Sequence, residues 1–154
     1  MTALELERLV LDAGERVDEW ADRVRHEPGR RVFEQLRLDE HVGVWLICWM
    51  PGHDTGFHDH DISSGALTVE RGSLREERLR FEGPPASVFL EAGQSVHFGP
   101  SEIHRVVNEG DVPAVSIHAY SPPLMRMGSY IFSEDGALLR EPIGPVEELR
   151  PLVA

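Results

Sequence analysis

The chain has no lysine, a single cysteine and no long run of apolar residues. Without a lysine ε-amino group, no side chain can form a Schiff base with a carbonyl substrate. Cys48 has no second cysteine with which it could form a disulfide inside the chain. No apolar stretch approaches the roughly 18 residues of a membrane-spanning helix, and residues 1–5 lack the basic and apolar regions of a signal peptide. We therefore expect a soluble, cytoplasmic protein.

Acidic residues outnumber basic ones. The chain has 27 aspartates and glutamates against 15 arginines, and its formal net charge is -12. This charge repels the phosphates of nucleic acids and anionic membrane surfaces, so we expect neither as a partner.

The 154 residues suffice for one domain with a core, and no shift in composition marks a second one. We expect a single domain that is a monomer or a small homo-oligomer.

The first 28 residues have a helical pattern. Apolar residues such as Leu6, Val10 and Val17 recur near helical spacing among charged residues. Gly14 is typical of a break or tight join, and Pro28-Gly29 of a stop. We expect the apolar stripe of this segment to pack against the rest of the domain.

Short apolar runs separated by Gly, Pro and Asp follow from Arg30 onward. The expected strands cover residues 31–38, 42–50, 66–71, 73–81, 87–90, 95–98, 103–108, 113–120 and 129–132. Short strands at this spacing predict a mainly β fold, a sandwich or barrel over residues 30–135, with residues 136–154 as a C-terminal extension.

Two turns and one charged run complete this expectation. Residues 70–73 and 132–136 have the composition of hairpin connections. The run 71–80 alternates the sign of its charges, which is typical of an exposed strand face.

Three histidines indicate a metal site. His58 and His60 lie two residues apart in a stretch with strand character, so both rings can point to one face, with Cα atoms about 7 Å apart. By itself this pair fits a solvated polar loop equally well. His104 supplies a third imidazole, and imidazole is the commonest protein ligand of divalent transition metals. The glycine and histidine spacings around the pair and around His104 resemble the two signature motifs of the cupin superfamily, which implies a jelly-roll β-barrel.

The proposed ligand set has no carboxylate. Many metal cupins carry a glutamate four or five residues after the second histidine, where this chain has Ser64 and Gly65. Three neutral imidazoles leave the charge of a divalent ion uncompensated, which suits an anionic substrate such as a thiolate together with O2. His53 and His97 are the rival ligands, because each lies beside one of the motifs.

A second polar set lies in residues 114–121. Ser116, His118 and Tyr120 alternate with apolar residues, so they share one face of a strand. If that face lines the barrel interior, the three side chains form a hydrogen-bonded relay that ends in a phenol beside the metal. If it faces solvent, the alternation describes an ordinary edge strand.

Together these motifs resemble the cysteine dioxygenase family of thiol dioxygenases, over about residues 29 to 125. The resemblance implies that His58, His60 and His104 hold a non-haem Fe(II) and that the set Ser116, His118 and Tyr120 lines the pocket. It implies an enzyme that oxidises a small thiol, cysteine or a close analogue, to its sulfinic acid and inserts both atoms of O2.

The chain departs from that family in two places. Animal members have a cysteine cross-linked to the tyrosine, and Gly65 occupies the matching position, so we expect an unmodified Tyr120. Members that prefer cysteine carry an arginine before the first motif, which pairs with the substrate carboxylate. One alignment brings Arg30 or Arg31 to that position, and another brings Glu34 and Gln35 there. A glutamine resembles the relatives that prefer 3-mercaptopropionate, and an acidic residue would suit an amine such as cysteamine.

Two further functions fit the same residues. The chain could be a non-enzymatic or sensory metal cupin that binds a small ligand, or a metal-independent sugar-nucleotide epimerase with a His-Tyr acid/base pair.

Cys48 could be a nucleophile, but its neighbours in residues 44–49 are apolar on both faces of the expected strand, which favours a packed core residue.

Overall fold

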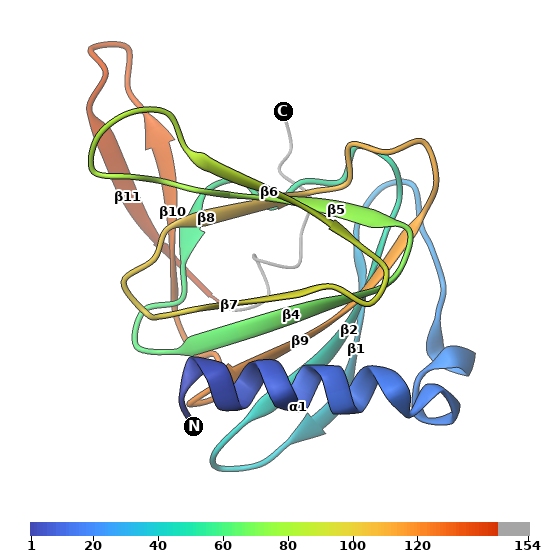
Figure 1. The fold of residues 1–154 in the computed structure, drawn as a ribbon. Coiled ribbons are helices and arrows are strands. Elements are labelled where there is room, and N and C mark those ends of the chain that lie inside the picture. Colours follow the sequence, from blue (N-terminus) through green and yellow to red (C-terminus); the bar gives the residue numbers. More distant parts are fainter. Residues whose placement is uncertain (145–154) are drawn as a thin grey trace.

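The computed structural model describes residues 1–144, which form one helix and two facing β-sheets (Figure 1). The chain begins with α1 (Ala3–Glu15) and two 3-10 turns, η1 (Val17–Glu19) and η2 (Ala21–Arg23). The strands are β1 (Val32–Leu38), β2 (Gly43–Trp49), β3 (His58–Asp59), β4 (Ser64–Arg71), β5 (Ser73–Arg78), β6 (Ala86–Glu91), β7 (Ser95–Phe98), β8 (His104–Val107), β9 (Ala114–Ser121), β10 (Met127–Phe132) and β11 (Leu138–Ile143).

The strands divide between a five-stranded sheet, in the order β1-β2-β9-β4-β7, and a six-stranded sheet, in the order β11-β10-β3-β8-β5-β6. All the strand pairs are antiparallel. Figure 1 shows the two sheets facing each other across a barrel, with α1 along the outer face of the five-stranded sheet. The predicted mainly β fold with an N-terminal helix is confirmed.

The helix covers one face of the sheet because its apolar residues lie on one side. Thr2 caps its N-terminus in a capping box with Glu5, and Leu6 and Val10 are fully buried against the strands. Of the two roles expected for Gly14, a break or a tight join, the structure shows the join: Gly14 lies in the last turn of the helix, where a Cβ atom would overlap the carboxylate of Glu70. In residues 1–144 no helix is long and apolar enough to cross a membrane.

The central strands of the five-stranded sheet, β2, β9 and β4, are mostly buried on both faces. On β9, Val115, Ile117 and Ala119 pack in the cluster under the helix. The alternate residues therefore face the barrel interior, where Tyr120 packs in a second cluster. Because β9 pairs with β2 on one side and β4 on the other, it is not an edge strand. The polar face of residues 114–121 is thus turned into the barrel.

The structure corrects two local expectations. Residues 70–73 do not close a hairpin, because β4 and β5 belong to different sheets and the turn at Gly72, with φ of 70°, carries the chain between them. Residues 132–136 do close a hairpin, between β10 and β11. The run 71–80 is not an exposed face throughout, since Leu74 and Glu76 are fully buried.

Two strands were absent from the sequence prediction. β3 has only two residues, and β11 lies in the segment expected to be an extension, where it adds an edge strand to the six-stranded sheet. Part of that expected extension, residues 145–154, lies outside the described residues.

Candidate metal centre

The short strand β3 brings the two sequence motifs together. It lies between β10 and β8, with Ser129 paired to His58 on one side and His104 paired to His58 on the other. His60 follows β3 directly and so remains on the same side of the chain as His58. The register of one residue pair, His58 with His104, therefore places histidines 46 positions apart at one point of the barrel interior.

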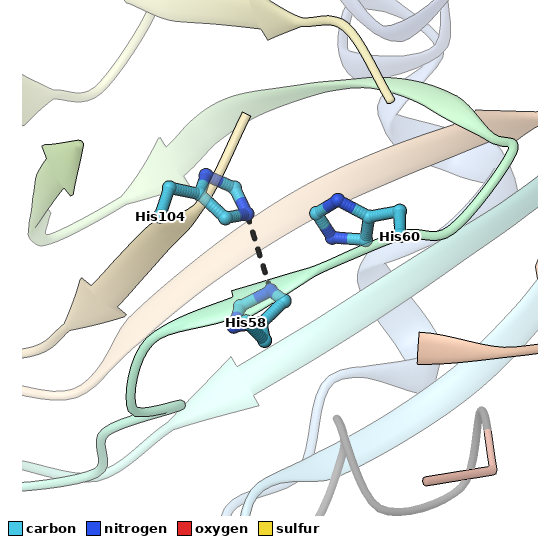
Figure 2. Close-up of side chains that lie close together, drawn as sticks. All are labelled: His58, His60 and His104. Carbon is cyan, nitrogen blue, oxygen red and sulfur yellow. Dashed lines mark hydrogen bonds between the residues drawn. The ribbon is translucent and has the colours of Figure 1, made fainter. Parts of the chain in front are cut away.

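The three imidazoles converge (Figure 2). One ring nitrogen from each of His58, His60 and His104 lies within 4.8 Å of the other two. The ring centroids are 4.6 to 4.9 Å apart, and all three side chains are buried. The 3.1 Å between Nε2 of His58 and Nε2 of His104 fits two ligands of one divalent ion, since metal–nitrogen distances are about 2.0–2.1 Å.

Two of the rings turn the same nitrogen outward. Nδ1 of His58 donates to the carbonyl of Gly56 at 2.9 Å, and Nδ1 of His104 donates to the carboxylate of Glu76 at 2.8 Å. Each ring therefore directs its Nε2 lone pair inward, and the two Nε2 atoms lie 3.1 Å apart. Two lone pairs facing each other in a buried site are the arrangement that a shared cation stabilises, so the residues present fit a metal.

Asp59, between the two ligand candidates, anchors this segment. Arg140 of β11 donates to both carboxylate oxygens, at 2.9 and 3.1 Å, and the Tyr130 hydroxyl donates at 2.5 Å. Burial acts to raise the pKa of Asp59, but the hydrogen bonds from Arg140 and Tyr130 outweigh it and hold that pKa well below its usual range. The β10–β11 hairpin thus fixes the strand that carries His58.

Ser116, His118 and Tyr120 form a continuous hydrogen-bonded set with Trp49. The indole nitrogen of Trp49, which can only donate, lies 2.8 Å from Ser116 Oγ. Ser116 Oγ lies 2.8 Å from His118 Nε2, and His118 Nδ1 lies 3.3 Å from the Tyr120 hydroxyl. If the serine hydroxyl donates its hydrogen bond to Nε2 of His118, then Nδ1 of His118 carries the proton and donates to Tyr120. Each residue in the order Trp49, Ser116, His118, Tyr120 then donates to the next one.

This set ends beside the three histidines. The rings of His60 and Tyr120 have centroids 5.1 Å apart, and Phe98 stacks on His60 at 4.8 Å. All of these side chains are buried. The phenol therefore lies at the edge of the candidate metal site, in surroundings where a hydrogen bond is stronger than in water.

The two arginines proposed for the substrate have opposite environments. Arg31 is buried, and its guanidinium lies 5.2 Å from the ring centroid of Trp49. Arg31 therefore contacts the residue that donates to Ser116. Arg30 is exposed and pairs with Glu27 at 2.9 Å on the outside of the barrel. Gln35 is exposed as well, and Glu34 pairs with Arg25 at 3.4 Å. The structure thus brings Arg31 toward the site and leaves Arg30, Glu34 and Gln35 out of it.

The rival residues lie apart from the cluster. Both ring nitrogens of His53 are used by the backbone, one accepting from Met50 at 3.0 Å and the other donating to Pro28 at 2.9 Å. His97 is exposed and contacts Glu7 of α1. Cys48 packs in the core, where burial raises the pKa of its thiol and so disfavours the nucleophilic thiolate.

Sequence reasoning missed Glu76 and Asp59 as parts of this site. Glu76 is fully buried, and burial raises the pKa of its carboxyl group while its contact with Arg78 acts in the opposite direction. Its surroundings in the sequence are charged residues of alternating sign, which gave no signal of a buried carboxylate. For Asp59, the position between two candidate ligands was the available signal.

Comparison with known proteins gives a family match over most of the chain. The model of the family described as cysteine dioxygenase type I matches residues 5–133. Among curated proteins, cysteine dioxygenase type 1 of Danio rerio is 35% identical over 116 residues, which cover 64% of this chain and 58% of that protein. Cysteine dioxygenase type 1 of Rattus norvegicus is 32% identical over 108 residues, which cover 59% of this chain and 54% of that protein. The matches thus span a little over half the length of these relatives.

Solved structures agree on the fold. A protein with a double-stranded β-helix domain from Klebsiella pneumoniae has a TM-score of 0.58 at 17% identity, covering 78% of this chain and 91% of that one. An oxalate oxidase in complex with glycolate has a TM-score of 0.57 at 18% identity, covering 71% of this chain and 61% of that one. These likenesses confirm the predicted cupin-type barrel.

Proposed function

The chain belongs to the cysteine dioxygenase type I family, and on that premise we propose that it is an iron-dependent thiol dioxygenase that converts a small thiol and O2 into a sulfinic acid. The observation that carries the proposal is the meeting, in one barrel interior, of three convergent imidazoles with a phenol at the end of a hydrogen-bonded set. Either feature alone fits several kinds of cupin, and their combination fits this chemistry.

In this proposal His58, His60 and His104 hold the metal. When bound, Fe(II) would supply open coordination positions for the thiolate and O2 and would mediate the transfer of electrons from sulfur to O2. The described cluster contains no carboxylate ligand, so the three histidines leave the positive charge available to an anionic sulfur. Burial of the rings excludes water from their surroundings, which strengthens each electrostatic contact there.

Tyr120 acts as a hydrogen-bond donor at the reacting centre. In this proposal His118 is the donor and the Tyr120 oxygen the acceptor, so the phenolic proton turns away from His118, and Ser116 fixes the orientation of His118 from the other side. Trp49 holds Ser116 in turn. A donor that is oriented before the reaction pays no reorganisation cost when charge develops near it.

Arg31 binds the carboxylate of the substrate. Its buried guanidinium beside Trp49 supports this role, since a planar guanidinium pairs with a carboxylate through two parallel hydrogen bonds. The proposed substrate is then a small thiol with a carboxylate, cysteine in the first place and 3-mercaptopropionate as the alternative. Cysteamine, which has no carboxylate, becomes a poor substrate.

An oxygen-electrode screen tests the proposal. The protein is purified, loaded anaerobically with Fe(II), and supplied in turn with cysteine, 3-mercaptopropionate and cysteamine, while O2 uptake is recorded and the sulfinic acid is measured. We expect uptake that requires both iron and a thiol and stops with a strong chelator. Metal binding without turnover would indicate a non-enzymatic or sensory cupin, and sugar-nucleotide epimerisation that persists in chelator would indicate the metal-independent alternative.

A further inference from the structure

Glu76 presents a buried carboxylate to the outer nitrogen of His104. Its side chain has no exposed surface, and Oε2 accepts from His104 Nδ1 at 2.8 Å. The other oxygen, Oε1, accepts from Nε of Arg78 at 2.7 Å. Both carboxylate oxygens are therefore engaged by donors. A buried carboxylate in this position costs desolvation energy, which its two donor contacts offset.

We propose that Glu76 is a positioning residue that holds His104 in its Nδ1–H form and strengthens Nε2 of that ring as a metal ligand. The proposal rests on the metal site of the proposed function. An imidazole that donates its outer N–H to a carboxylate has a fixed tautomer and a fixed ring plane, and its inner nitrogen becomes more basic.

The outer nitrogen of His58 has a weaker partner than that of His104. Nδ1 of His58 donates to the neutral carbonyl of Gly56, whereas His104 donates to a charged group. Hydrogen bonds to ionised groups are roughly twice as strong as neutral ones. His104 is thus the more strongly oriented of these two rings.

Arg78 extends the contact from the site to the surface. Besides Glu76, it contacts Glu102 at 3.1 Å and the carbonyl of His97 at 2.6 Å. Glu102 in turn accepts from the backbone of Gly99 at 2.8 Å. The loop that leads from β7 into His104 is therefore tied to the same arginine that neutralises Glu76. This arrangement fixes both the side chain and the backbone approach of His104.

The first test reads the tautomer of His104 directly in the metal-free protein. Long-range ¹⁵N–¹H correlation spectra distinguish Nδ1–H from Nε2–H imidazoles. We expect His104 to be Nδ1–H in the wild type, and to become a mixture of tautomers in Glu76→Ala. Glu77→Gln is the matched control, because Glu77 is the next residue on β5 and pairs with Arg105 instead. It should leave the His104 signal unchanged.

The second test measures the anaerobic Fe(II) dissociation constant by competition with a chelator. Loss of an outer hydrogen-bond partner typically weakens metal binding about 10- to 100-fold, and we expect this loss in Glu76→Ala. Glu76→Gln can still accept from His104, although its amide then faces Arg78, so its affinity should lie between those of the wild type and Glu76→Ala. Glu77→Gln should bind like the wild type.

The outcomes separate this inference from the proposed function. If the wild type binds no Fe(II), the proposed function is contradicted. The tautomer of His104 in the metal-free protein would still decide whether Glu76 positions that ring. Wild-type His104 in the Nε2–H form, or a Glu76→Ala protein with the tautomer and iron affinity of the wild type, would overturn the positioning role. If Glu76→Ala does not fold, the wild-type spectrum and Glu76→Gln carry the decision.

Discussion

The Nε2 atoms of His58 and His104 lie 3.1 Å apart, although the two residues are 46 positions apart in the sequence. Each ring turns Nδ1 outward to a fixed acceptor, so neither can rotate its inner nitrogen away without losing a hydrogen bond. Both rings therefore direct Nε2 toward the same point, as two ligands of one ion must. This shared orientation is the basis of the first prediction.

We predict that the wild type binds one Fe(II) per chain and that His58→Ala, His60→Ala and His104→Ala each remove most of it. Three neutral ligands bind a divalent ion only moderately, and two leave too weak a site. Metal analysis after anaerobic loading measures the effect, with His53→Ala as the control, since both nitrogens of His53 contact the backbone instead. Full iron content in the His104 variant would refute the ligand assignment.

Tyr120→Phe should keep its iron and lose turnover by roughly 10- to 1000-fold, because it removes a hydrogen bond aimed at the reacting centre and leaves the ligands in place. Steady-state rates with metal analysis of the same samples test this expectation. Peptide mapping should also find an unmodified Tyr120. An active, iron-loaded Phe variant would exclude the phenol from the reaction.

Substrate choice depends on Arg31. A buried Arg–carboxylate pair contributes about 2–5 kcal/mol, which corresponds to roughly 30- to several-thousand-fold in affinity. Arg31→Met should therefore raise KM for cysteine sharply and have little effect on cysteamine, while Arg30→Met, on the outside of the barrel, should change neither. Measured kcat/KM values for cysteine and cysteamine in both variants test this role of Arg31. If the preference for cysteine survives in Arg31→Met, another group binds the carboxylate of the substrate.

Gly65 leaves room for Phe98. A Cβ atom at residue 65 would overlap the Phe98 ring and lie 3.0 Å from Cδ1 of Tyr120. Gly65→Cys should therefore destabilise the protein by about 1–3 kcal/mol, a fall of roughly 2–12 °C in Tm. Gly29→Cys, at an exposed position with no atom within 4 Å of the added Cβ, should not. Adding Phe98→Leu should restore part of the loss, and an unchanged Tm in Gly65→Cys would show that Phe98 can move aside.

The sequence predicted the strands that have a clear apolar pattern and the histidines that can bind a metal. The boundaries of β1, β7 and β9 follow alternating apolar residues, and those of β2 follow a continuous apolar run. The choice of the three histidines as ligands follows from the preference of metals for imidazole. For β3 the sequence indicated only strand character around His58 and His60, because a strand of two residues has no period that would set its bounds. β11 escaped prediction because it is an exposed edge strand that contains Pro142.

Residues whose role depends on register could not be placed from the sequence. Arg30 and Arg31 are neighbours with the same chemistry, and only the start of β1 decides which one turns inward. Glu76 has the pattern of an exposed strand, and its burial follows from the pairing of β5 with β8, which sets Glu76 and Arg78 beside the strand of His104. A carboxylate that contacts a buried histidine is recognised only once both strands are in place.

Isotope analysis of the product tests the central claim most directly. The Fe(II)-loaded protein is given cysteine under ¹⁸O2 in unlabelled water, and the products are analysed by mass spectrometry. A thiol dioxygenase yields a sulfinic acid in which both added oxygens are ¹⁸O. This function would be contradicted by a product with one labelled oxygen or by a disulfide alone. It would also be contradicted if iron-loaded protein gave no product with cysteine, 3-mercaptopropionate or cysteamine.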